Sequence, residues 1–191
     1  MNLPNRLSFL RIILVPVFLA MIIINFTGHY FVAIGVFVIA AFTDFLDGFI
    51  ARKYNLVTNM GKFLDSVADK MLTTTALIAV ACYGLIPNPY GLICVCLFVV
   101  RDLAINVIRQ IGASKNVIIP ADKLGKYKAF SLDIALPIIF LYAGLMELSV
   151  NATVVTAIMW VGYGFMIIAS ILNIISGIHY ICKNKKVFSE E

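Results

Sequence analysis

Residues 31–52 read FVAIGVFVIAAFTDFLDGFIAR, an apolar run that ends in two aspartates and an arginine. A helix needs roughly 20 apolar residues to cross about 30 Å of hydrocarbon, and this run is long enough. Its apolar residues do not alternate with polar ones, so the run lacks the pattern of a transmembrane β-strand. Because backbone polar groups inside lipid must pair within their own segment, the run predicts a membrane-spanning helix.

The rest of the chain has the same apolar character. Of its 191 residues, 62% are hydrophobic and 13% are charged, about half the charged fraction of a soluble domain. Polar breaks divide the sequence into expected helices over residues 7–26, 31–52, 62–83, 90–112, 127–148 and 151–182. We therefore predict an all-α polytopic membrane protein with six transmembrane helices, forming a single domain over residues 1–191.

The first apolar run has one alternative interpretation. Arg6 precedes this run and Arg11 stands at its start, as basic residues do in a secretory signal. No small-x-small cleavage site follows the run, so we expect a retained helix rather than a cleaved signal peptide. Pro16 and Pro137 fall inside expected helices, and neighbouring membrane helices can satisfy the carbonyls that they leave free.

Basic residues predict the topology. The turns at residues 27–28, 87–89 and 147–151 contain no lysine or arginine, whereas the N-terminus, residues 53–62, residues 115–128 and the C-terminal tail do. Since positive charge marks the cytoplasmic side, both termini are expected in the cytoplasm, which requires an even number of helices. The net charge of +5 then lies against the anionic leaflet.

Four aspartates in two adjacent helices are unusual, because an ionised group at the bilayer centre costs at least about 2.5 kcal/mol. Asp44 and Asp47 are three residues apart, and Asp65 and Asp69 are four apart. Each pair therefore lies on one helical face. A short linker makes the two helices antiparallel neighbours, so all four carboxylates can converge near the cytoplasmic ends.

Such a cluster favours bound cations, because unscreened carboxylates would repel one another. Oxygen ligands suit Mg²⁺, Mn²⁺ or Ca²⁺, and two bridged divalent ions can clamp a phosphate during in-line displacement. Two Mg²⁺ or Mn²⁺ ions are the expectation. Gly48 would let a bulky ligand approach the helix backbone, and Arg52 can address a phosphate from the same side.

The assembled pattern is D-x2-D-G-x2-A-R-x8-G-x3-D-x3-D, running DFLDGFIAR over residues 44–52 and GKFLDSVAD over residues 61–69. It resembles the signature of the CDP-alcohol phosphotransferase (CDP-alcohol phosphatidyltransferase) family at every fixed position. The opening residues MNLPNRLS with Arg11, the Asp69-Lys70 pair and residues 125–128, GKYK, look like the phosphatidylglycerophosphate synthase branch.

The resemblance implies an enzyme that transfers a phosphatidyl group from CDP-diacylglycerol to an alcohol, here glycerol-3-phosphate, and releases CMP. It implies that Asp44, Asp47, Asp65 and Asp69 hold the metal ions and that Asp69 is also the catalytic general base. Gly48, Ala51, Arg52 and Gly61 would line the CDP site. It further implies a homodimer in the bacterial cytoplasmic membrane, with the active site facing the cytoplasm and no nucleic-acid partner.

Basic residues suggest where the acceptor's phosphate would bind. Asp102, Asn106 and Arg109 follow four- and three-residue spacing on one helix face, with Arg101 beside them. Such a stripe gains nothing by facing lipid, so it is expected to face a cavity. Pairing of the two arginines with Asp102 is the alternative to ligand binding.

Lys123, Lys126 and Lys128 begin the next helix at the same level, and Arg101, Arg109 and Lys126 are the candidate phosphate ligands. The alternative for the lysines is a solvated positive-inside loop.

Other functions remain open at this stage. Sister enzymes would use inositol phosphate, serine or phosphatidylglycerol as acceptor. Intramembrane aspartates could instead serve a divalent-cation transporter, and a non-catalytic membrane scaffold would release no CMP.

Overall fold

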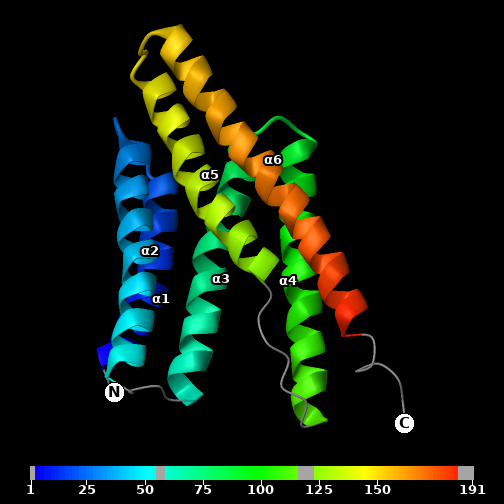
Figure 1. Ribbon diagram of the computed structural model, residues 1–191. Coiled ribbons are helices and arrows are strands. Elements are labelled where there is room, and N and C mark those ends of the chain that lie inside the picture. The colour runs from blue at the N-terminus through cyan, green and yellow to red at the C-terminus, as the bar shows by residue number, and fades with distance from the viewer. Residues whose placement is uncertain (1–2, 55–58, 116–122, 185–191) are drawn as a thin grey trace.

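The computed structural model describes residues 3–54, 59–115 and 123–184. Within these ranges the chain forms α-helices joined by short turns, as Figure 1 shows. They are α1 (Leu3–Ile23), α2 (His29–Lys53), α3 (Asn59–Cys82), α4 (Tyr90–Ser114), α5 (Lys123–Glu147) and α6 (Ala152–Lys183). All six predicted helices are confirmed, and Pro16 and Pro137 lie inside α1 and α5 as expected.

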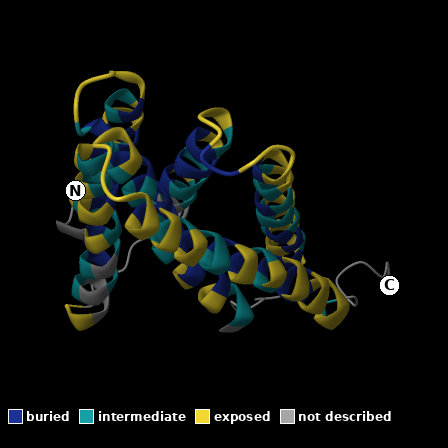
Figure 2. Cartoon of the chain, turned by 90° about the horizontal axis from the view of Figure 1, so that it is seen from above, coloured by how far each residue is buried: buried dark blue, intermediate teal, exposed yellow. Residues whose placement is uncertain are grey.

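In the described part of the chain, five helices are long and apolar enough to cross a membrane, over Asn5–Ile23, His29–Gly48, Tyr90–Ser114, Leu124–Glu147 and Ala152–Lys183. The apolar part of α3 is shorter, Lys70–Cys82, because the first half of that helix carries the polar motif. Large apolar side chains such as Ile39, Phe42 and Val100 are exposed, and Figure 2 shows exposed residues along the outer faces of the helices. This distribution fits a polytopic membrane protein surrounded by lipid.

The helices run alternately up and down (Figure 1). As a result, α1 begins and α6 ends on the same side of the bundle, the side where α2 ends and α3 begins. Basic residues Arg6, Lys53, Lys115 and Lys183 lie near helix termini at this end. We call it the basic end.

The packing of α1 refines one expectation from the sequence. We expected α2 and α3 to be antiparallel neighbours. Among the described residues they contact each other only sparsely, whereas α1 packs extensively against both. Side chains of α1 therefore reach the space between the two motif helices. Elsewhere α5 packs along α6 and against α2, while α4 packs against α3 and α6.

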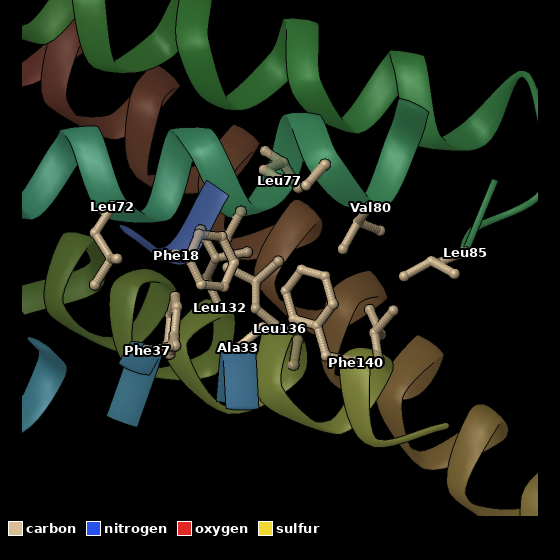
Figure 3. Close-up of a cluster of buried hydrophobic side chains, with 14 of the residues drawn as sticks. Phe18, Ala33, Phe37, Leu72, Leu77, Val80, Leu85, Leu132, Leu136 and Phe140 are labelled. Carbon is tan, nitrogen blue, oxygen red and sulfur yellow. The ribbon is translucent and has the colours of Figure 1, made fainter. Parts of the chain in front are cut away.

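A hydrophobic core holds α1, α2, α3 and α5 together (Figure 3). Phe18 of α1 lies at its centre, with ring centroids 6.0 Å from Phe37 and 5.6 Å from Phe140. Leu77 and Leu136 are also almost completely buried there. Aromatic pairs at these separations add about 0.5–1.5 kcal/mol beyond their burial, so this core fixes the positions of the helices that carry the polar site.

Candidate active site

The acidic part of the site lies where α1 meets α2 near the basic end. Arg11 of α1 contacts both described aspartates of α2: one guanidinium nitrogen lies 2.6 Å from Asp44 Oδ1, and the other lies 2.6 Å from Asp47 Oδ2. Ser8, one turn earlier on α1, donates a hydrogen bond of 3.1 Å to the same Asp47 oxygen. Asp44 and Asp47 therefore share one face of α2, as their spacing predicted.

Burial makes this arrangement energetically important. The side chain of Arg11 is 1% exposed and that of Asp47 is 5% exposed, whereas Asp44 is 44% exposed. A buried arginine is costly unless carboxylates and hydrogen bonds compensate for its lost hydration, and the two aspartates supply that compensation.

Sequence reasoning did not place Arg11 or Ser8 in the site, because both residues lie outside the aspartate motif. A signal was nevertheless present. Asn5, Ser8 and Arg11 recur every three residues, and all three are buried polar side chains in an apolar helix.

The remaining motif positions are described only in part. Gly48 and Gly61 are partly buried on their helices. The side chains of Ala51, Arg52, Asp65 and Asp69 lie outside the described part of the structure. Among described side chains, no group of three or more histidines, cysteines, aspartates or glutamates is gathered, so convergence of all four carboxylates stays a prediction.

The two described carboxylates fit a divalent cation in their chemistry and placement. Both offer only oxygen atoms, the ligands that Mg²⁺ and Mn²⁺ accept. Both also contact the guanidinium of Arg11, so an ion bound there would share the two carboxylates with that positive charge. Because Asp44 is 44% exposed, an ion can approach this pair from outside the helix bundle.

The basic part of the site is a cavity of about 240 Å³ between α3, α4, α5 and α6. Its lining includes five cations and one carboxylate among the described residues: Lys70, Arg101, Arg109, Lys126, Lys128 and Asp102. The three candidate phosphate ligands, Arg101, Arg109 and Lys126, are thus brought together. The polar face of α4, with Arg101, Asp102 and Arg109, therefore faces a cavity, as predicted.

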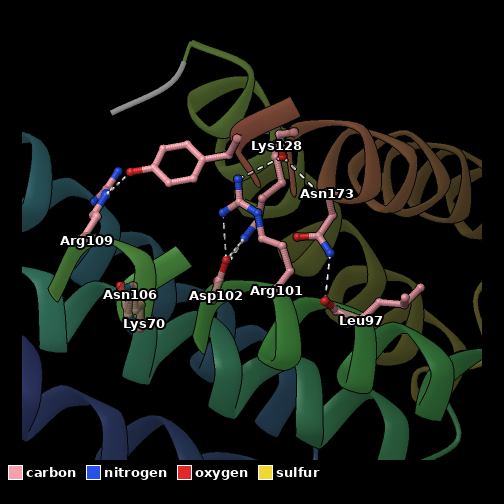
Figure 4. Close-up of polar contacts among 10 residues, drawn as sticks. Lys70, Leu97, Arg101, Asp102, Asn106, Arg109, Lys128 and Asn173 are labelled. Atoms are coloured by element: carbon pink, nitrogen blue, oxygen red, sulfur yellow. Dashed lines mark hydrogen bonds and ion pairs between the residues drawn. The ribbon is translucent and has the colours of Figure 1, made fainter. Parts of the chain in front are cut away.

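Asp102 organises two of these cations (Figure 4). Its carboxylate accepts hydrogen bonds from Arg101 at 2.9 Å and from Lys128 at 2.9 and 3.0 Å. Lys128 is 5% exposed, and its ammonium lies 5.0 Å from the ring centroid of Phe98. Lys128 is therefore a buried ion-pair partner, in contrast to the solvated loop lysine that was the alternative.

Arg101 fits between α5 and α6 because two glycines leave room for it. A Cβ atom on Gly125 would lie 3.3 Å from Arg101 Nη2, and one on Gly177 would lie 3.1 Å from Arg101 Cγ. The guanidinium also donates to Ser176 on α6 at 2.9 Å. Arg101 thus pairs with Asp102, as the alternative interpretation foresaw, and also lines the cavity.

Arg109 is held differently. Its Nε donates to the hydroxyl of Tyr180 at 3.1 Å, and its guanidinium lies 5.7 Å from the Tyr180 ring centroid. Tyr180 is only 2% exposed and was not foreseen as a site residue, since nothing in α6 linked it to α4. Lys126 is exposed at the cavity's edge.

Lys70 connects the basic cavity to the motif helix. It follows Asp69 directly in α3, donates to Asn106 of α4 at 2.5 Å, and lines the basic cavity. It also lines a second hollow of about 650 Å³ between α3 and α4, together with Asp102, Asn106 and Arg109. With five lining cations and one described carboxylate, the cavity suits an anion beside the aspartate motif.

Comparisons with known proteins agree with this geometry. The chain is 34% identical over 196 residues to the CDP-diacylglycerol–glycerol-3-phosphate 3-phosphatidyltransferase of Bacillus subtilis (strain 168), covering 96% of this chain and 95% of that protein. The enzyme of the same name from Rickettsia felis is 35% identical over 190 residues, with 98% and 97% covered. A protein named probable phosphatidylglycerophosphate synthase from Mycobacterium tuberculosis is 33% identical over 186 residues, with 95% and 81% covered.

The family comparison covers most of the chain. The family described as CDP-alcohol phosphatidyltransferase matches residues 1–171, which include both motif helices and the residues of α4 and α5 that line the basic cavity. Together with near full-length relatives above 30% identity, this match shows that the chain belongs to the CDP-alcohol phosphatidyltransferase family.

Proposed function

We propose that this protein transfers the phosphatidyl group of CDP-diacylglycerol to glycerol-3-phosphate in phospholipid biosynthesis, giving phosphatidylglycerophosphate and CMP. The observation that carries the proposal is the basic cavity lined by Lys70, the residue after Asp69. An acceptor that bears its own phosphate needs such cations beside the reacting groups. The names of the near full-length relatives point to the same acceptor.

The donor's pyrophosphate is assigned to the aspartate motif. Asp44, Asp47, Asp65 and Asp69 would hold two divalent ions, Mg²⁺ or Mn²⁺, and Gly48, Ala51, Arg52 and Gly61 would line the cytidine site. When bound, the ions supply positive charge that stabilises the phosphoryl oxygens and the departing CMP. Support for this assignment comes from the oxygen-only pair on α2, Asp44 and Asp47, whose contacts with one guanidinium show that both carboxylates reach the same place.

The acceptor's phosphate is assigned to the basic cavity. Arg109 and Lys126 provide the ligands nearest to the basic end, while Arg101 adds charge from a fixed position between Asp102 and Ser176. Tyr180 orients Arg109 through its hydroxyl and its ring. A preorganised cationic pocket of this kind positions the acceptor's hydroxyl for attack.

The proposed reaction is a single displacement at phosphorus. Asp69 takes the proton from the primary hydroxyl of glycerol-3-phosphate, and that oxygen attacks the donor phosphorus that bears diacylglycerol. A new phosphorus–oxygen bond forms to glycerol-3-phosphate while the bond to the bridging oxygen of CMP breaks. CMP carries away the bonding electron pair, so atoms and charge balance without another reactant.

Orientation and assembly belong to the same proposal. Arg6, Lys53, Lys115 and Lys183 lie near helix termini at the basic end, which supports placing that end and the active site in the cytoplasm of a bacterial cell membrane. The protein is further proposed to work as the homodimer that the family resemblance implies.

A CMP-release assay tests the function. Detergent-purified protein is given CDP-diacylglycerol, with glycerol-3-phosphate, inositol phosphate, serine or phosphatidylglycerol as acceptor, each with and without chelator. We expect release only with glycerol-3-phosphate and none with chelator. Release with a different acceptor would refute the proposed product while keeping the family. No release with any acceptor would favour a transporter or scaffold.

A variant pair sharpens the choice of acceptor. Arg109→Ala and Lys126→Ala remove cations from the basic cavity and should raise the KM for glycerol-3-phosphate by about tenfold or more, because charge-assisted hydrogen bonds contribute about 1.5–3 kcal/mol each. A serine or phosphatidylglycerol transferase would show nearly unchanged kinetics in both variants.

A further inference from the structure

The packing of α1 against α2 follows one buried stripe on each helix. On α1 the buried residues recur three or four positions apart: Asn5, Ser8, Arg11, Val15, Phe18 and Ile22. On α2 the same spacing joins Ala33, Phe37, Ala40, Thr43 and Asp47. Residues at this spacing lie on one side of a helix, and the two helices run in opposite directions (Figure 1). The start of the α1 stripe therefore meets the end of the α2 stripe.

Apolar packing sets the register of the two stripes. Phe18 is fully buried, and its ring centroid lies 6.0 Å from that of Phe37 (Figure 3). Arg11 stands seven residues before Phe18, and Asp44 stands seven residues after Phe37. Because these separations are equal in antiparallel helices, the register that joins the two rings also joins Arg11 to Asp44. A slip of one turn, about 5.4 Å, would separate both pairs.

The guanidinium of Arg11 bridges carboxylates on two successive turns of α2. Its two terminal nitrogens contact Asp44 Oδ1 and Asp47 Oδ2, each at 2.6 Å. A guanidinium is a planar fork that holds two acceptors in fixed directions, whereas a lysine ammonium is a single point charge. Since the Arg11 side chain is 1% exposed, its surroundings restrict it to this geometry. Ser8 adds a hydrogen bond to the same Asp47 oxygen.

We propose that Arg11, assisted by Ser8, is a positioning residue for the reaction: it holds Asp44 and Asp47 in the orientation in which they bind a divalent cation. The proposal rests on the metal assignment of the proposed function. An ionised carboxylate offers about four lone-pair positions, so contact with Arg11 leaves each group able to bind an ion as well. Loss of a residue that orients metal ligands typically lowers metal affinity by about 10–100-fold.

The charge of Arg11 acts in the opposite direction, because a guanidinium repels a cation bound beside it. A substitution that keeps the charge separates the two effects. Arg11→Lys retains one positive charge and loses the fork that reaches both carboxylates. Weaker metal binding by this variant therefore reports the lost orientation of the carboxylates.

Metal binding is measured without turnover. Detergent-purified full-length protein is titrated with Mn²⁺ in the absence of substrates, and free Mn²⁺ is followed by electron paramagnetic resonance. We expect the Kd for Mn²⁺ to rise about tenfold in Arg11→Lys, equivalent to about 1.4 kcal/mol.

A stability control separates positioning from general loss of structure. Met166 is 3% exposed on α6, a helix that carries no residue of the aspartate motif. Met166→Ala should lower the melting temperature by leaving a cavity, while its Kd for Mn²⁺ stays within about twofold of the unmodified protein.

Ser8→Ala is a milder variant that decides the matter if Arg11→Lys does not fold. It keeps Arg11 and removes one hydrogen bond to Asp47, so the Kd for Mn²⁺ should rise about threefold. Ser8→Thr retains a hydroxyl at the same position and should bind Mn²⁺ like the unmodified protein.

An unchanged or lower Kd in folded Arg11→Lys would overturn the proposal, because Arg11 would then only stabilise the fold or compete with ions for the carboxylates. An equal rise in Kd for Met166→Ala would overturn it too, since lost stability would explain the effect. If the unmodified protein bound no Mn²⁺, the metal assignment of the proposed function would fail and the role of Arg11 with it. The unmodified protein thus distinguishes the two failures.

Discussion

Arg11 of α1 lies 2.6 Å from the carboxylate of Asp47 on α2, and both side chains are almost fully buried. The same guanidinium contacts Asp44, so a helix outside the recognised motif sets the position of two motif carboxylates. The first helix consequently belongs to the proposed active site as well as to the helix bundle.

Replacement of Arg11 by methionine should destabilise the protein and reduce turnover. Removing one partner of a buried ion pair typically costs about 3–5 kcal/mol, because the remaining charge loses its compensation. We expect a lower melting temperature in detergent and at least a tenfold loss of CMP release. Arg6→Met is the matched control because Arg6 is exposed on the same helix. Equal behaviour of the two variants would contradict a role for Arg11.

Replacement of Tyr180 by phenylalanine should weaken acceptor binding specifically. The variant keeps the ring beside Arg109 but loses the hydroxyl that accepts from its Nε. A hydrogen bond to a charged group contributes about 1.5–3 kcal/mol, so we expect the KM for glycerol-3-phosphate to rise by about tenfold, with little change in the KM for CDP-diacylglycerol. Tyr127→Phe alters an exposed tyrosine and should change neither value.

Two glycines on α6 make a matched pair for alanine substitution. A Cβ on Gly177 would lie 3.1 Å from Arg101 Cγ, whereas one on Gly164 would have nothing within 4 Å. Gly177→Ala should therefore displace Arg101 and cost about 1–3 kcal/mol through overpacking. Gly164→Ala should be neutral or stabilising, since alanine favours a helix over glycine by about 1 kcal/mol. Thermal unfolding measures the melting temperatures of both variants. If Gly177→Ala melted at as high a temperature as Gly164→Ala, Arg101 would not be held in a fixed position.

Asp102 and Lys128 should show strong energetic coupling. Asp102→Asn leaves Lys128 buried beside a neutral amide, while Lys128→Met removes the ammonium that the carboxylate accepts from. Residues within one ion-pair network interact by about 0.5–3 kcal/mol, so the double variant should be less destabilised than the sum of the single variants. Denaturation of the unmodified protein, the two single variants and the double variant measures this coupling energy. Additive losses would show that the pair contributes nothing beyond its separate contacts.

Asp69→Asn should abolish turnover while keeping the donor bound. An amide cannot take the acceptor's proton, and loss of a general base typically costs about 10²–10⁴ in rate. CMP release measures turnover, and binding of CDP-diacylglycerol by calorimetry shows that the donor site persists. Unchanged turnover would remove the assigned base.

Metal removal supplies an independent check of the aspartate motif. Chelation should abolish CMP release by the unmodified protein, and added Mg²⁺ or Mn²⁺ should restore it, because oxygen ligands accept both ions. Full activity in excess chelator would rule out the proposed metal requirement.

The sequence alone determined the helical membrane fold, the helix count and the family. Helix-length apolar runs can satisfy their backbone only within themselves in lipid, and the spacing of Asp44 and Asp47 places both on one face whatever surrounds them. These properties are local, so they follow from residue order alone.

Only the tertiary structure decided which helices meet around these residues. It placed α1 against both motif helices, buried Arg11 against Asp44 and Asp47, and brought Tyr180 of α6 to Arg109 of α4. Helix–helix contact in lipid depends on the shapes of packed side chains along whole faces, such as the fit of Phe18 against Phe37 and Phe140. That fit joins residues distant in the chain, and no spacing within a single helix encodes it.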